Sequence, residues 1–563
     1  MRIRHILVAL AALAFTSNSI SAQDLDPTVV INKTYSGKLR EVYKPVLEMP
    51  VPDSLKSFDR GFDYSIFDQP YKVAGGFTPY FLTMKPSPKV PESMKLYLKA
   101  GAGYTLNPTL DLVWSPLRSR ALKMDVYALH RSYVGNYVSY TPGSDHWWGY
   151  DLMSRAGVDG RYEHRAFSAN FDVSYFGLAS KDQVKDRMYD ALDVKVGLSS
   201  KPKSGSYFRY DIAAAYRFAE DKINYFEGGK DYVGEHLVNV DASLGQVMRW
   251  GHQILMDVET DVTIYSTSVV GQLSVTPHYL MKMGRWTLDA GFRISAIIRP
   301  KDDPQGLFAK RGQVAYPEIK AYYSVIPDAM RAYAHITGGN KLNTYASLLD
   351  RNHHVDPRYA AGRADLMNVT VERVSSALGV EGRIGPNFSY DLRGGYACYG
   401  NGLFDAVGAY VNAGTSELQY VPAFGYSPYQ RLFAAMDWLL MMDSMQFDGT
   451  VQYQHVWGIR NADCLLAPAA LAGDVNFEYN WNKRIFAGVD CEFSTGRKGS
   501  VEAFSADVVI PGYVDLGVNF EYAVSRAVSV WARGGNLLHM SIQRNPFYAQ
   551  KGPSFTAGIC LNL

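Results

Sequence analysis

The sequence has little of what marks most enzymes and nucleic-acid-binding proteins. Its 563 residues include only four cysteines, and none of them has the CxxC spacing of a metal site or redox motif. The formal net charge is +2, so the chain lacks the concentrated positive field that binds a nucleic-acid backbone. No HExxH, GxSxG, Walker-loop or GxGxxG pattern occurs, and we predict no enzymatic activity and no bound metal or cofactor.

Long hydrophobic runs are also missing beyond residue 22, where no 18 apolar residues follow one another. A membrane helix needs about 20 such residues, so we expect no helical membrane span. Residues 1–22 have the three parts of a secretory signal peptide. Arg2 and Arg4 form a basic start, an apolar run extends from Ile6 to Phe15, and a small polar stretch ends at Ala22. We therefore expect the chain to be exported.

From about residue 94 onward, the sequence contains one alternating segment after another. In residues 166–177, 207–219 and 286–297, apolar side chains alternate with polar ones. Successive side chains of a strand point to opposite faces, so each segment has one apolar and one polar face. These segments are longer than the five or six residues of most soluble strands and match the roughly 9–11 residues of a tilted membrane strand.

Short and long connections alternate between these segments, which is the layout of an outer-membrane barrel. We predict an all-β fold in which residues 94–563 form a transmembrane antiparallel β-barrel of about 22 strands, with 20–22 as the range. Short turns would lie on the periplasmic side and long loops outside, including 134–149, 220–234, 339–366 and 401–428. The fifteenth and sixteenth strands are expected at Phe388–Tyr399 and Tyr429–Leu440.

Both ends of the chain resemble known proteins. The final segment contains Gly535-Asn536-Leu537-Leu538 and then Tyr548-Ala549-Gln550-Lys551-Gly552-Pro553-Ser554-Phe555-Thr556-Ala557-Gly558-Ile559, which resembles the terminal hairpin of TonB-dependent receptors. Near the start, Val29-Val30-Ile31, Pro50-Val51-Pro52-Asp53-Ser54 and Phe62-Asp63-Tyr64-Ser65-Ile66 look like the leader of plug-less relatives found in Bacteroidota. The resemblance implies a 22-stranded barrel in the cell outer membrane, inserted by the barrel-assembly machinery. The chain departs from the family by ending in Leu563, where such barrels usually end in Phe.

Residues 23–93 differ from the rest of the sequence. They include nine prolines and have no sustained period, so they oppose both helix and central strand. The stretch is too short for the globular plug domain of a full receptor. Three roles stay open: a reduced plug at the barrel mouth or in the lumen, a periplasmic tether for a partner, and a flexible linker.

Charged residues of both signs fall on the polar faces of the predicted strands. In a wet pore they would set the preference for ions or solutes, and otherwise they would solvate the inner wall and pair with one another. Asp257, Glu259 and Asp261 form an acidic stripe on one strand. The predicted lumen-facing residues are Arg209, Asp211, Arg217, Asp257, Glu259, Asp261, Asp289, Arg293, Glu478, Asp490 and Glu492.

Two further groups of residues are candidates for a site. An aromatic group in the expected outer loop 134–149 would stack a sugar, hold a partner or anchor the barrel at the bilayer interface. Its members are Tyr137, Tyr140, His146, Trp147 and Trp148. His353 and His354 lie in the expected loop 339–366 beside Asp350, but adjacent histidines do not face one ligand position, so we expect no metal there.

These observations favour an outer-membrane solute channel or receptor of the TonB-dependent type, with a reduced or absent plug. The alternative is a non-transporting barrel that scaffolds a complex with a surface lipoprotein or periplasmic partner. A barrel-embedded hydrolase ranks third, because no Ser/His or carboxylate constellation stands out on neighbouring strands. In each case the surroundings are outer-membrane lipid, and nucleic acid is not a partner.

The role of the proline-rich segment is testable by deletion. Removing residues 24–88 while keeping the signal peptide should leave an assembled barrel, because the deleted stretch cannot complete a sheet. We expect larger conductance in planar bilayers and greater antibiotic sensitivity of the cells. Unchanged permeability of an assembled barrel would identify the segment as a tether.

Overall fold

The computed structural model describes residues 95–563 with gaps. The residues outside the description within this range are 120, 139–145, 203–204, 206, 227, 249–250, 266–268, 300–313, 356–366, 412–417, 461–464, 502–505, 547 and 551. The predicted signal peptide and the proline-rich segment 23–93 lie outside the described residues.

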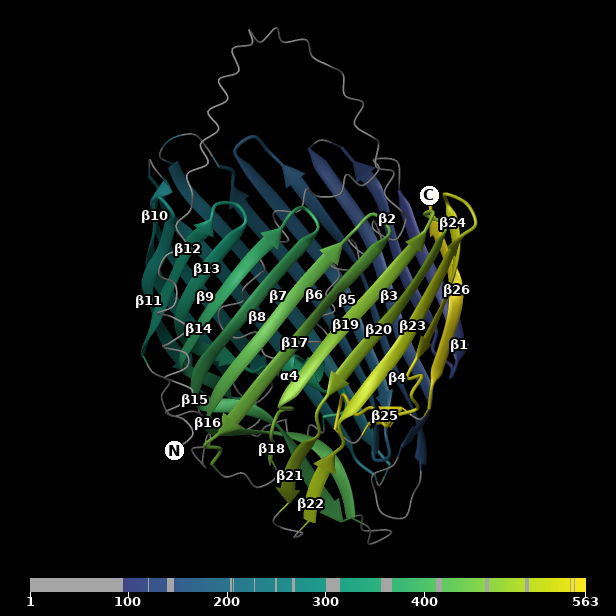
Figure 1. The fold of residues 1–563 in the computed structure, drawn as a ribbon. Helices are drawn as coiled ribbons and strands as arrows, with labels where there is room; N and C mark the ends of the chain where they lie inside the picture. Colours follow the sequence, from purple (N-terminus) through teal and green to yellow (C-terminus); the bar gives the residue numbers. More distant parts are fainter. Residues whose placement is uncertain are drawn as a thin grey trace, which may run out of the picture. The chain divides into compact units, whose positions relative to one another are not determined.

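The described residues form a closed antiparallel β-barrel (Figure 1). One sheet contains 24 strands, of which β18 and β25 are two-residue flanking pieces, so 22 strands make the wall. The wall closes where the first strand pairs with the last, from Tyr97 opposite Asn562 to Tyr104 opposite Phe555. The predicted fold and strand number are confirmed.

The strands of the wall follow one another in chain order. They are β1 (Leu96–Tyr104), β2 (Thr109–Arg118), β3 (Leu122–Val138), β4 (His146–Glu163), β5 (Phe167–Lys181), β6 (Lys185–Ser200), β7 (Tyr207–Tyr225), β8 (Lys230–Val247), β9 (Gln253–Tyr265), β10 (Val269–Met283), β11 (Trp286–Ile298), β12 (Ala315–Ile326), β13 (Met330–Leu342), β14 (Val369–Ile384), β15 (Phe388–Val411), β16 (Leu418–Met441), β17 (Met445–Trp457), β19 (Leu471–Trp481), β20 (Ile485–Ser494), β23 (Tyr513–Ala523), β24 (Val528–Gly535) and β26 (Ser554–Asn562).

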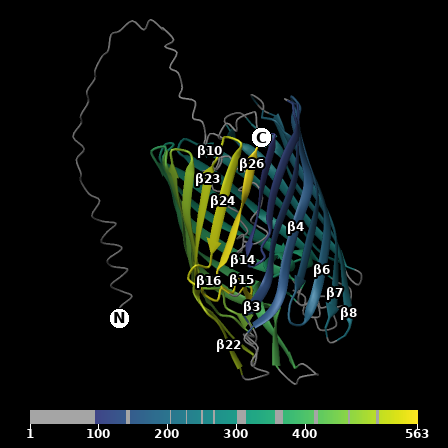
Figure 2. The same ribbon diagram turned by 90° about the vertical axis from the view of Figure 1, so that its right-hand side faces the viewer.

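A few short elements accompany the wall. They are α4 (Tyr345–Arg351), β18 (Leu465–Leu466), β21 (Arg497–Val501), β22 (Ala506–Ile510) and β25 (Ala549–Gln550). The strands β21 and β22 pair with each other as a separate two-stranded sheet, and β18 pairs with β15. Figure 2 shows β22 beyond the ends of most barrel strands, on the side opposite the C-terminus. No helix in the described part of the chain is long and apolar enough to cross a membrane.

The alternation of the sequence appears as two faces of each strand. On β7, the side chains of Phe208 and Ile212 are 57% and 37% exposed, whereas those of Ala219 and Asp221 on the other face are buried. Asp221 contacts α4, which lies inside the barrel (Figure 1), so the exposed apolar face is the outer one. An apolar outer face and a polar inner one suit a barrel surrounded by lipid.

Several expected long loops are paired strand instead. β15 and β16 are 24 residues each and stay paired as far as Val411 opposite Leu418, so the prediction of a loop at 401–428 is wrong. The predicted end of the fifteenth strand, Tyr399, is the site of a register shift. The expected loops 134–149 and 220–234 are likewise mostly strand. Ladder hydrogen bonds join backbone groups, so a strand can continue where the apolar alternation of its side chains fades.

The assignment of faces on β7 is testable with two neighbouring substitutions. Ile212→Arg puts a charge on the apolar outer face, where it costs about 2–4 kcal/mol near the bilayer midplane. Asp211→Arg changes the adjacent residue, which shares the inner face with Asp221. We expect Ile212→Arg to reduce folded outer-membrane barrel far more than Asp211→Arg, measured by heat-modifiable gel mobility. Equal losses would show that the register is wrong.

Candidate functional site

The segment between β13 and β14 turns into the barrel and carries the helix α4. Thr344 caps the helix, because its side-chain oxygen accepts a hydrogen bond from the amide of Ser347 at 3.2 Å. Tyr345, Leu348 and Leu349 share one side of the helix and are fully buried. The sequence prediction treated 339–366 as an outer loop. The Thr344 cap and the apolar spacing of Tyr345, Leu348 and Leu349 are the sequence features that could have predicted this helix.

A glutamate of the inner wall holds the start of α4. The Glu235 carboxylate of β8 accepts hydrogen bonds from the backbone amides of Tyr345 and Ala346 at 3.2 and 3.0 Å. It also accepts one from the Tyr265 hydroxyl at 2.8 Å. The first amides of a helix have no partner within the helix, and their partial positive charge favours a carboxylate.

Two cations of β6 hold the other end of the helix. Lys185 donates to the carbonyl of His354 at 3.0 Å, and Arg187 donates to the carbonyls of His353 and Val355. Arg187 also forms an ion pair with Asp221 at 3.1 Å, in which both side chains are fully buried. Buried charges of this kind are stable only when paired, and removing one partner typically costs about 3–5 kcal/mol. The inner wall therefore fixes both ends of α4.

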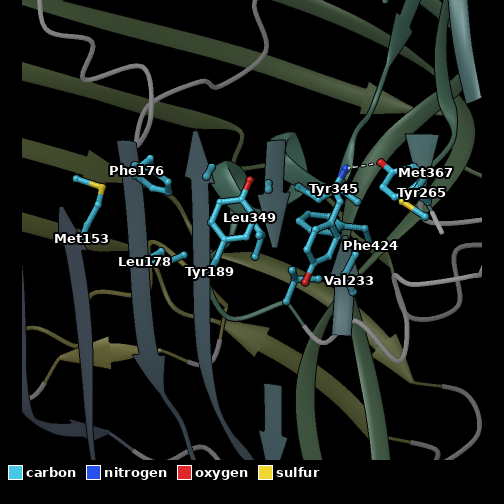
Figure 3. Close-up of a cluster of buried hydrophobic side chains, with 14 of the residues drawn as sticks. Met153, Phe176, Leu178, Tyr189, Val233, Tyr265, Tyr345, Leu349, Met367 and Phe424 are labelled. Carbon is cyan, nitrogen blue, oxygen red and sulfur yellow. Dashed lines mark hydrogen bonds between the residues drawn. The ribbon is translucent and has the colours of Figure 1, made fainter. Parts of the chain in front are cut away.

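An apolar layer joins α4 to two separate parts of the wall (Figure 3). One part consists of residues on β4 to β9, and the other of Leu403 on β15 and Phe424 on β16. Arg351 at the end of α4 forms an ion pair with Asp405 of β15 at 2.8 Å, and Arg497 reaches the same carboxylate at 2.6 Å. The helix thus connects two regions of the barrel interior. The residues of the first part include Met153, Phe176, Leu178, Tyr189, Ala191, Ala219, Val233 and Tyr265.

The predicted outer aromatic group is divided between the two faces of the wall. Tyr137 is only 2% exposed and stacks on Trp147 at 4.3 Å between ring centroids, so these two residues do not form an outer contact surface. Trp148 is 54% exposed on the other face, with the Lys181 ammonium 5.3 Å from its ring. His146 is exposed, and Tyr140 lies outside the described residues. The group is split because it belongs to β3 and β4, where neighbouring side chains alternate in direction.

The two adjacent histidines after α4 have different surroundings. His353 Nδ1 lies 3.2 Å from the Asp151 carboxylate, whereas the His354 ring stacks on Tyr548 with 3.8 Å between centroids. The described residues contain no group of three or more His, Cys, Asp or Glu side chains arranged to hold a metal ion.

Burial controls the pKa values of this segment. Burial lowers the pKa of His354 to about 3 and raises that of Asp350 to about 6. Burial also opposes the charged form of His353, but the Asp151 carboxylate outweighs it and raises the pKa of His353. The pKa values of the two adjacent histidines are therefore shifted in opposite directions, lowered for His354 and raised for His353.

Most of the predicted lumen-facing residues are paired across strands. Arg217 of β7 bonds Asp193 of β6 at 2.6 and 3.0 Å. Glu259 lies 3.1 Å from Arg293, and His278 lies between Asp257 and Asp289 at 3.2 and 2.7 Å. Asp261 accepts hydrogen bonds from Asn239 and Gln272. The acidic stripe of β9 is thus matched by partners on the neighbouring strands.

The remaining predicted residues are less enclosed. Arg209 bonds Gln253 at 3.2 Å, and Asp211 is exposed. Asp490 lies 3.4 Å from Arg533, and Glu492 lies 2.7 Å from Arg544. Glu478 is half-buried on β19. Whether any of these side chains selects ions or solutes stays a prediction.

A cavity of about 500 Å³ remains beside α4. The helix contributes Ser347, Asp350 and Arg351 to its lining, and the wall contributes residues from β4 to β23. Polar and charged side chains make up much of this lining, whereas Phe176 and Leu403 belong both to it and to the apolar layer.

No protein-family profile and no curated protein matches the sequence. Several solved structures do match. The siderophore receptor PirA from Acinetobacter baumannii has a TM-score of 0.60 at 11% identity, over 84% of this chain and 80% of that one. The copper transporter OprC has a TM-score of 0.59 at 10% sequence identity, over 83% of this chain and 80% of that one. The FrpB iron transporter from Neisseria meningitidis has a TM-score of 0.59 at 7% sequence identity, over 84% of this chain and 82% of that one. The shared property is the fold.

The neutral His354 makes the docking of α4 sensitive to pH. The pKa of His354 in the docked state lies below the ordinary 6.5. Its contribution to the free energy of docking is therefore complete above pH 6.5 and is lost as the pH falls toward 3. Between pH 7 and pH 5 we expect docking to weaken by about 2 kcal/mol relative to His354→Phe, which keeps a ring for stacking but cannot be protonated.

Hydrogen–deuterium exchange of the amides of α4, corrected for intrinsic rates, measures this difference. The raised pKa values of Asp350 and His353 act in the opposite direction and strengthen docking as the pH falls. Both residues are present in the wild type and in His354→Phe, so the comparison cancels their contributions. An identical response of the two proteins to pH would contradict the assignment of a neutral buried His354.

Proposed function

We propose that the chain is an outer-membrane channel or receptor of the TonB-dependent type, with a lumen narrowed by its own β13–β14 segment. The observation that carries the proposal is the docking of α4 across the interior beside a charged cavity of about 500 Å³. A cavity inside the barrel with a largely polar and charged lining is suited to the passage or capture of a hydrophilic solute.

Three other observations support this proposal. The barrel shares its fold with a siderophore receptor, a copper transporter and an iron transporter. Its outer face is apolar, as a bilayer requires. Residues 1–22 would export the chain, and the likeness of residues 29–66 to plug-less relatives in Bacteroidota supports a barrel without a full plug. The short turns would then face the periplasm and α4 would enter from the outside.

A second candidate is a barrel that transports nothing and holds partner proteins. One observation favours it: β15 and β16 exceed the other strands in length, and β18 and the β21–β22 pair accompany them on the long-loop side. The surface formed by these extended strands would suit the binding of a surface lipoprotein. The two candidates differ in whether the lumen conducts.

Replacing residues 345–355 with glycine and serine tests the proposal. The replacement removes the apolar side chains by which α4 packs on the wall and the His354 ring that stacks on Tyr548, so it undocks the segment and frees the interior. We expect purified wild-type protein to form pores of small unit conductance in planar bilayers. The variant with the replaced segment should form pores of larger unit conductance.

Val524→Ser, at an exposed turn between β23 and β24, is the control and should behave as the wild type. Heat-modifiable mobility verifies that all three proteins are folded barrels. Absence of conductance in both the wild type and the replaced protein would overturn the channel and favour the scaffold.

A further inference from the structure

The cavity beside α4 has more positive than negative side chains in its lining. Its cations are Arg155, Lys195, Arg217, Lys341, Arg351, Arg497 and Arg544. Its carboxylates are Asp193, Asp350, Glu372 and Asp405. Among these carboxylates Asp350 has a pKa raised to about 6 by burial, so it holds its charge less firmly than an exposed aspartate.

Ion pairs account for part of this charge. Arg217 is bound to Asp193, and Arg351 and Arg497 share Asp405. Arg544 bonds Glu492 and Asp515, which are not part of the lining. When Arg544 is set aside for that reason, six cations still face four carboxylates, an excess of two positive charges.

Arg155 and Lys195 contribute most to the excess. They lie on β4 and β6, on either side of β5, and no ion pair joins either of them to a carboxylate among the described residues. Arg155 donates to the Ser174 hydroxyl at 3.5 Å, and its Nε is buried without a hydrogen-bond partner. Lys195 is exposed to the interior. Its neighbour in register, Asp172, accepts a hydrogen bond from Tyr127 and lies outside the lining.

We propose that this cavity binds a small organic anion with two or more negative groups, held by Arg155 and Lys195. A volume of about 500 Å³ falls within the roughly 300–1,000 Å³ of small-ligand pockets. Guanidinium and ammonium groups form strong charge-assisted hydrogen bonds with carboxylates and phosphates, and partial enclosure strengthens them. The inference rests on the proposed function, because it names the class of solute that the lumen would accept.

Titration calorimetry on the purified, folded barrel in detergent tests this proposal. Citrate is the carboxylate probe and pyrophosphate is the phosphate probe, with the neutral sugar sucrose for comparison. We expect saturable binding of citrate or pyrophosphate and none of sucrose. Absence of binding by both anions, or equal binding of sucrose, would overturn the proposal.

Two substitutions locate the bound anion. Lys195→Gln and Arg155→Gln should each weaken binding by about tenfold, since each removes a charged hydrogen-bond donor. Arg209→Gln is the matched control, because Arg209 shares the inner face of β7 with Arg217 but does not line the cavity. Lys195 is exposed, so its replacement should leave folding unchanged. Equal weakening by Arg209→Gln, or none by Lys195→Gln and Arg155→Gln, would overturn the assignment to this cavity.

Conductance measured on the same preparations separates the two proposals. Pores that conduct without binding either anion would leave the channel standing and overturn the anion site. Specific binding without conductance would support the anion site and overturn the channel.

Discussion

A strand in lipid has no water to satisfy its backbone, and the pairing of β1 with β26 is what meets this requirement. The eight residue pairs from Tyr97 to Tyr104 leave neither strand as a free edge. Closure on this scale has a consequence for the interior. A barrel of 22 strands is too wide for its own inward side chains to fill, so some other part of the chain, or water, must occupy the lumen.

Part of that space is occupied by a helix of only seven residues. So short a helix is not stable by itself, because the cost of its first turn exceeds what a few hydrogen bonds return. The wall supplies the missing stability at both ends. The Glu235 carboxylate accepts hydrogen bonds from the free amides at the start of the helix. Lys185 and Arg187 donate to carbonyls of the residues that follow its end, and Asp221 pairs with Arg187. The Glu235 carboxylate at the start of the helix suits the positive end of the helix dipole.

The helix α4 meets two kinds of surroundings in the interior. Aromatic and aliphatic side chains pack against it and fix its place. Charged side chains surround a cavity beside it, and Phe176 and Leu403 belong to both. In the proposed channel, α4 would narrow the lumen, and the cations that line the cavity would act on any anion that enters. The cross-strand pairing of Asp257, Glu259 and Asp261 keeps the inner wall of β9 from presenting a continuous negative field.

The alternation of Phe208, Arg209, Tyr210, Asp211 and Ile212 was enough to predict strands with two faces, because a period of two depends only on local geometry. The count of strands followed from the turns, which are also local. Strand length beyond the apolar band was not readable, since backbone ladders form with almost any side chain, as β15 and β16 show. The expected loop cluster of Tyr137, Trp147 and Trp148 is wrong for the same reason, because these residues belong to paired strands whose side chains alternate in direction. The place of α4 was decided only by tertiary structure, because Glu235 and Ala346 are 111 residues apart and Arg187 and Val355 are 168 apart. Contacts at such separations depend on the curvature of the closed wall, which no short stretch of sequence contains.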